Sequence, residues 1–106
     1  AEWLRIAYGR RGLRVSCLCP QGVKTQLIMG DANPNAFLLA EAITAEECAR
    51  EVVNALENET FLILPHREVA EYIVKKAENR DRWLNSLRKI RNEILAGKEK
   101  KLSKGN

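Results

Sequence analysis

The chain has 106 residues and a mass of 12.0 kDa, enough for one ordinary domain and no more. Hydrophobic residues make up 45% and charged residues 30%, which is typical of a folded globular domain and excludes wholesale disorder. No apolar run approaches the ~20 residues needed to span a bilayer, so we expect no membrane partner. Three cysteines are few and odd in number for a secreted disulfide scaffold, so we expect free thiols and a cytoplasmic protein.

The positive charge is concentrated near the C-terminus. The formal net charge is +4, but residues 80–104 carry nine Lys or Arg against three acidic residues, so residues 1–79 are mildly acidic. A basic segment can attract nucleic acid. The basic residues here lack the interleaved aromatics of a single-strand binding surface. A solvated helix face is therefore the favoured interpretation, and a basic helical nucleic-acid-binding module stays an alternative.

The first eight residues predict a helix. Trp3, Leu4, Ala7 and Tyr8 recur at i, i+3 and i+4 spacing, and the glycines that follow at 9 and 12 would end the helix. No Ser, Thr, Asp or Asn cap precedes it. Two interpretations remain open: the chain begins inside a larger protein, or a short N-terminal helix frays.

The next segment changes its period. Alternating apolar residues predict a strand over 13–19 that Pro20 ends. Residues 21–39 are rich in Gly, Asn, Asp and Pro and predict an irregular segment, with a short helix over 36–41. A long irregular stretch in a small domain is usually a functional or a disordered loop.

A second strand follows a well-marked helix. Thr44-Ala45-Glu46-Glu47 has the form of a capping box, so we expect a helix over 44–57 with Asn58 as a left-handed stop. Residues 61–64 are apolar without alternation, which is typical of a strand in a parallel sheet covered on both faces. Strands 13–19 and 61–64 should therefore be parallel neighbours.

The C-terminal third predicts two further helices within 67–95. The first is marked by Val69, Ala70, Ile73 and Ala77, and the second by Trp83, Leu87, Ile90 and Ile94. Residues 96–106 have too few apolar side chains to hold them down, and we expect a basic flexible tail there.

The run from Ala1 to Thr25 resembles a piece of a short-chain dehydrogenase/reductase. In that family the helix bearing the catalytic Tyr-x-x-x-Lys ends in a Gly-containing turn and enters the sixth strand with a pattern like Leu13-Arg14-Val15. The strand ends in Pro-Gly, followed closely by Val and Thr; here the stretch is Pro20-Gln21-Gly22-Val23-Lys24-Thr25, with Gln21 as an insertion. The resemblance covers about residues 1–66. It implies the α/β fold class, with residues 1–95 a partial, C-terminal portion of a Rossmann-like doubly wound parallel sheet.

The resemblance also implies a function. The parent protein would be an oxidoreductase that transfers a hydride between NAD or NADP and a small carbonyl or alcohol substrate. The implied cofactor-binding residues are Pro20, Gly22, Val23 and Thr25. The backbone of Val23 would pair with the nicotinamide carboxamide, and the Thr25 hydroxyl would reach that group or a phosphate oxygen. Ligands of open α/β sheets bind beyond the C-terminal ends of the strands, where Pro20 is expected.

Several catalytic features are missing from the sequence. It contains neither a glycine-rich phosphate turn nor a Tyr-x-x-x-Lys pair before the strand motif; Tyr72 and Lys76 have the right spacing but come after it, so we interpret them as surface residues. Two cysteines on one strand face, with Cys48 and His66 elsewhere, do not complete a metal site. We therefore assign no catalytic or metal-binding residue and expect the isolated chain to be inactive.

The expected sheet leaves a strand edge without a partner. In the resembled fold a strand lies on both sides of 13–19, whereas only 61–64 is available here. An open edge is a template for pairing with another chain, so we expect a homo-oligomer. A non-catalytic binding or oligomerisation module is the remaining alternative function.

Overall fold

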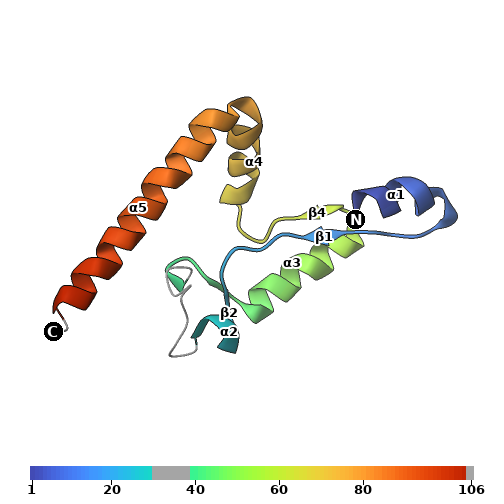
Figure 1. Ribbon diagram of the computed structural model, residues 1–106. Coiled ribbons are helices and arrows are strands. Elements are labelled where there is room, and N and C mark those ends of the chain that lie inside the picture. The colour runs from blue at the N-terminus through green and yellow to red at the C-terminus, as the bar shows by residue number, and fades with distance from the viewer. Residues whose placement is uncertain (30–38, 105–106) are drawn as a thin grey trace. The chain divides into compact units, whose positions relative to one another are not determined.

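The computed structural model describes residues 1–29 and 39–104 (Figure 1). The chain is mixed α/β and mostly helical, with two small sheets of two parallel strands each. It divides into two compact units, Ala1–Arg67 and Glu68–Asn106. The first unit contains α1 (Glu2–Tyr8), η1 (Gly9–Arg11), β1 (Cys17–Leu18), β2 (Val23–Lys24), α2 (Gln26–Met29), β3 (Ile43–Thr44), α3 (Ala45–Glu57) and β4 (Leu62–Ile63).

Helix α1 forms where the periodicity predicts it and ends at the two glycines. It has no side-chain N-cap, and the 3-10 turn η1 follows it directly. Gly12 then reverses the chain with φ of +82°, a left-handed conformation that glycine adopts without steric cost. None of the residues of α1 is buried: Trp3 is 67% exposed and Ile6 84%.

Strands β1 and β4 are parallel, as the apolar patterns predict. The register pairs Cys17 with Leu62 and Leu18 with Ile63. Both strands are shorter than the expected 13–19 and 61–64, because β4 is confined between the turn after α3 and Pro65. Only the last part of the alternating segment therefore finds backbone partners in β4.

The expectation of an irregular segment over 21–39 was wrong in its first part. Residues 23–24 form β2, which pairs in parallel with β3, and α2 follows immediately. Two-residue strands are too short to show a period in the sequence, so non-local pairing alone defines them. Residues 36–38 of the short helix expected over 36–41 lie outside the described residues.

Helix α3 begins with the expected capping box. The Thr44 hydroxyl accepts a hydrogen bond from the Glu47 amide at 3.1 Å, and the Glu47 carboxylate accepts one from the Thr44 amide at 2.8 Å. The expected left-handed stop at Asn58 was wrong: its φ is −89°, and the next residue, Glu59, has a φ of +54°. Asn58 instead donates from its side chain to the Asn54 carbonyl.

The core of the first unit is small. Its buried side chains are Ile28, Cys48, Ile63 and His66. Helix α3 contacts strands of both sheets, β2 and β3 as well as β4, and Figure 1 shows it running beside the strands. Its apolar face is covered only in part, since Val53 and Leu56 are exposed.

The second unit consists of α4 (Glu68–Glu78) and α5 (Arg80–Lys104). Tyr72 of α4 and Trp83 of α5 are in ring contact, with centroids 5.9 Å apart. Helix α5 passes through Gly97, so the expected domain boundary at 95–96 lies within a helix and the tail over 96–106 begins in helical conformation. No helix of the described residues is long and apolar enough to cross a membrane.

Candidate functional site

The candidate site is the segment that leaves β1. Cys17 and Cys19 donate their amides to the carbonyls of Phe61 and Ile63, at 2.7 and 3.0 Å, which carries the β1–β4 ladder to its C-terminal end. Pro20 and Pro65 then follow on the two strands. Pro65 has no N–H, so the β4 segment adds no further donor to the ladder, whereas Pro20 alternates to the other edge of β1.

Gly22 anchors the next part of the segment. Its carbonyl accepts the Ile43 amide at 3.1 Å, and the residue is buried. This bond joins the segment to the start of β3 and fixes the direction of β2. The four residues implied by the family resemblance, Pro20, Gly22, Val23 and Thr25, thus lie on one short segment between β1 and α2.

Val23 presents its backbone to the side of β2 away from β3. In a parallel ladder, backbone groups of alternate residues face the partner strand. Gly22 bonds to Ile43, so Gly22 and Lys24 face β3, and the N–H and C=O of Val23 face the opposite edge. A donor and an acceptor on one residue, both on the edge of β2 where the described residues pair no strand, form a pair that matches a planar carboxamide.

Thr25 lies at the start of α2. Its carbonyl accepts the amides of Ile28 and Met29, at 3.1 and 3.0 Å, while its side chain is exposed. The hydroxyl makes no hydrogen bond to another residue in the part of the chain that the structure describes. It therefore does not cap α2 and is free to bind a ligand.

His66 is excluded from a metal site on the sequence and is given no other role there, so its contact in the structure was missed. The side chain is only 4% exposed, and its Nδ1 accepts the Gln21 amide at 3.0 Å. Gln21 is the first residue after Pro20 with an amide to donate. The sequence did contain a signal: a proline follows each strand, and the chain's single histidine comes directly after Pro65.

The thiols of Cys17 in β1 and of Cys19, just after it, lie on one face, as the alternation predicts. The Sγ atoms of Cys17 and Cys19 are 3.7 Å apart. The hydrogen bond to Cys17 raises the pKa of Cys19 above its ordinary 9.0, with smaller contributions from burial and from the charge of Cys17. All three cysteines are free thiols, and the described residues contain no cluster of three or more His, Cys, Asp or Glu that could hold a metal ion.

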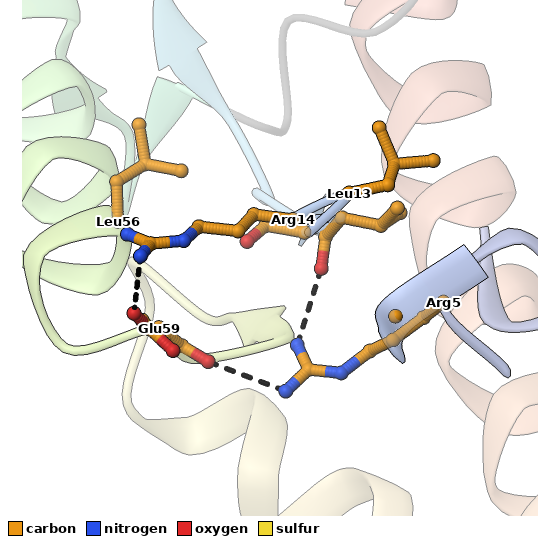
Figure 2. Close-up of a pocket in the computed structure, with 8 residues that line it drawn as sticks. Arg5, Leu13, Arg14, Leu56 and Glu59 are labelled. Atoms are coloured by element: carbon orange, nitrogen blue, oxygen red, sulfur yellow. Dashed lines mark hydrogen bonds and ion pairs between the residues drawn. The ribbon is translucent and has the colours of Figure 1, made fainter. Parts of the chain in front are cut away.

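A separate pocket of about 270 Å³ lies near α1 and the turn after α3 (Figure 2). Arg5 donates to the carbonyls of Val15 and Glu59, at 3.2 and 3.3 Å, and Arg14 forms an ion pair with the Glu59 carboxylate at 3.0 Å. Arg5 also lies over the Phe61 ring. The contacts of Arg5 with two backbone carbonyls join α1 to the start of the β1 segment and to the turn after α3.

Comparison with known proteins adds no relative. No protein-family model, no curated protein and no solved structure matches the chain.

Proposed function

We propose that this chain is the C-terminal part of an NAD(P)-dependent oxidoreductase of the short-chain dehydrogenase/reductase type. The complete enzyme would transfer a hydride between the nicotinamide cofactor and a carbonyl or alcohol substrate. The segment from Pro20 to Thr25 would hold the nicotinamide end of the cofactor. The Rossmann-like sheet and the cytoplasmic location belong to the same proposal.

The backbone of Val23 carries the proposal. Its N–H and C=O face the edge of β2 away from β3, next to the C-terminal end of β1. A carboxamide that pairs with both groups would be fixed in orientation, which decides the ring face that presents its hydride. Strands β1 and β4 are parallel, and α3 lies between them in the sequence. This strand–helix–strand unit supports the proposal, since ligands of open α/β sheets bind beyond the C-terminal ends of the strands.

The Thr25 hydroxyl is the second proposed contact. It is exposed and makes no hydrogen bond to the described residues, so a cofactor oxygen or nitrogen could bind it without displacing a protein partner. The chemistry of hydride transfer would come from the cofactor and from residues outside this chain. This chain's own part is to bind and orient the nicotinamide.

The test uses the complete protein and the KM for the cofactor. Thr25→Ala should raise KM by about tenfold, the loss expected for one hydrogen bond to a bound ligand, with a much smaller change in kcat. Thr25→Ser should restore KM because it keeps the hydroxyl. Thr60→Ala is the matched control, since Thr60 is also exposed but precedes β4, at the opposite end of the strands. An unchanged KM in Thr25→Ala with full activity would contradict the assigned contact.

A non-catalytic binding or oligomerisation module is the second candidate function. The observation that favours it is the exposure of apolar residues on α1, where Trp3, Leu4 and Ile6 are uncovered. Such a module would bind no nicotinamide cofactor when complete, and the two proposals therefore give opposite results in a cofactor titration.

A further inference from the structure

We infer that His66 is the residue that positions the candidate cofactor segment, by holding the Gln21 amide with its Nδ1 atom. The inference rests on the proposed function for its consequence in binding. The hydrogen bond itself is a property of the fold and can be tested without the cofactor.

The position of His66 follows from the parallel strand pair. Ile63 is the last residue of β4 and pairs with Leu18 of β1, so the segments beyond both strands emerge at the same end of the sheet. Cys17 and Cys19 donate to β4, and the alternation of the ladder turns Pro20 toward the other edge of β1. The following amide, that of Gln21, bonds to the imidazole of His66 at 3.0 Å in place of a carbonyl of the neighbouring strand.

This bond requires one form of the imidazole. Nδ1 accepts a hydrogen bond and so carries no proton, which in the neutral ring places the proton on Nε2. Nε2 is buried and finds no hydrogen-bond partner among the described residues. Burying the Nε2 donor without a partner costs free energy of folding. The hydrogen bond from the Gln21 amide to Nδ1 offsets part of that cost.

Two adjacent hydrogen bonds fix the segment. Gln21 is held by His66 on the β4 side, and the carbonyl of Gly22 accepts from Ile43 of β3 at 3.1 Å. Together they set the plane of the peptides before Val23 and hence the direction of its N–H and C=O. Loss of the His66 contact would leave the segment held only on its β3 side, through the pairing of Gly22 and Lys24 with that strand, and would free Gln21.

The experiment uses the full 106-residue chain, in which His66 is the sole histidine, so every imidazole signal belongs to it. Nitrogen NMR of histidine-labelled chain should show the neutral ring with its proton on Nε2. A ring protonated on Nδ1 at neutral pH would overturn the inference. The second readout is hydrogen exchange of the Gln21 amide, which reports directly on the bond to Nδ1.

Two variants separate the hydrogen bond from the bulk of the ring. Asn places its amide oxygen near the position of Nδ1, so His66→Asn should retain protection of Gln21. His66→Phe keeps a ring but no acceptor and should speed exchange at Gln21 by about tenfold. The Glu47 amide is bonded to Thr44 of β3, so in every variant it reports whether β3 and the start of α3 remain folded.

The outcomes are distinct. Unchanged Gln21 exchange in His66→Phe, with Glu47 protected, would overturn the inference. If His66→Phe loses protection at Glu47 as well, His66→Asn decides: protected Gln21 supports the inference, and exposed Gln21 with protected Glu47 overturns it. In the complete protein, His66→Phe should raise the KM for cofactor with a smaller change in kcat, and His66→Asn should restore it. A complete protein that binds no nicotinamide cofactor would refute the proposed function while the tautomer and Gln21 exchange still decide the role of His66.

Discussion

The carboxylate of Glu47 accepts a hydrogen bond from the backbone amide of Thr44 at 2.8 Å, and this bond links the stability of α3 to pH. The bond from the Thr44 amide, and then that from its hydroxyl, lower the pKa of Glu47 below its ordinary 4.5. A lowered pKa in the folded state gives stability that is present above pH 4.5 and lost as the pH falls through the lowered value. We expect α3 to lose helicity in that acidic range.

The matched variants for this prediction are Glu47→Gln and Glu46→Gln. Glu47→Gln should reduce the loss of helicity as the pH falls below 4.5, the ordinary pKa of the carboxyl, since the shift is downward. Glu46 lies in the same turn without bonding Thr44, so its variant should behave as wild type. Circular dichroism across this range is the measurement. Equal acid sensitivity of Glu47→Gln and wild type would contradict the account.

The contact between the thiols of Cys17 and Cys19 predicts that Cys19 reacts with alkylating agents at a higher pH than an isolated thiol does. Because the hydrogen bond to Cys17 is the largest cause of the raised pKa of Cys19, Cys17→Ala should lower the pH midpoint at which Cys19 becomes alkylated. Mass spectrometry of the peptide containing Cys19 would follow the reaction across pH. Cys48→Ala is the control, because Cys48 is not among the causes of the shift. A midpoint that does not move in Cys17→Ala would refute the coupling of the two thiols.

The left-handed residue after α3 predicts a backbone effect on stability. Glu59 has a φ of +54°, a conformation that costs a non-glycine residue about 1–2 kcal/mol. Its ion pair with Arg14 is exposed and contributes only about 0–1 kcal/mol. Glu59→Gly loses the ion pair but relieves the backbone, whereas Glu59→Ala loses the ion pair alone.

The free energy of unfolding should therefore be about 1 kcal/mol higher for Glu59→Gly than for Glu59→Ala, measured by urea denaturation. Asn58→Gly is the control, since Asn58 has a φ of −89° and gains nothing from glycine there. Equal stability of the two Glu59 variants would contradict a strained backbone at this position.

The open edge of β1 predicts association of the chain. Cys17 and Cys19 bond to β4, so the N–H and C=O of Leu18 face the other edge, where the described residues place no strand. Leu18 is exposed, as are Trp3 and Ile6 of α1. Sedimentation of the chain at micromolar concentration should show species larger than the 12.0 kDa monomer.

Charge on that edge should weaken the association. Leu18→Lys introduces a charge that opposes pairing of the strand with another chain. Leu27→Lys is the matched control, because Leu27 is 88% exposed but lies on α2. A monodisperse wild-type monomer with cooperative unfolding would contradict association, and equal association of the two variants would exclude the β1 edge as its route.

Local signals in the sequence predicted local structure well. The capping box of Thr44 and Glu47 was found because both partners lie within one turn, and the parallel strands were found from their apolar patterns. The length of β1 could not be predicted, since it depends on how much of β4 lies between a turn and Pro65. The left-handed stop was assigned to Asn58 on residue preference, whereas the chain places Glu59 there, paired with Arg14.

The candidate site stays a prediction from a motif, and its surroundings could not be predicted. Pro20, Gly22, Val23 and Thr25 are near neighbours in sequence, and the structure places them between β1 and α2. The pairing of β2 with β3 and the bond from Gln21 to His66 join residues separated in sequence, and no periodicity carries such information. The direction of the Val23 backbone therefore required the structure.

The proposed binding of the nicotinamide carboxamide depends most directly on the N–H of Val23, and a substitution by proline removes that N–H. The Val23 amide does not face β3, and proline is tolerated where a strand residue donates nothing to its ladder. Val23→Ala keeps the amide and controls for the lost side chain. Lys24→Pro removes an amide on the β3 side and should disrupt the β2–β3 pair instead.

The deciding measurement is the dissociation constant of the reduced nicotinamide cofactor for the complete protein carrying each Val23 variant, followed by fluorescence titration. The account predicts binding about tenfold weaker for Val23→Pro than for Val23→Ala, with the fold retained in both. Equal affinity of the two variants would contradict the role of the Val23 backbone, and a complete protein that binds no such cofactor would contradict the proposed function itself.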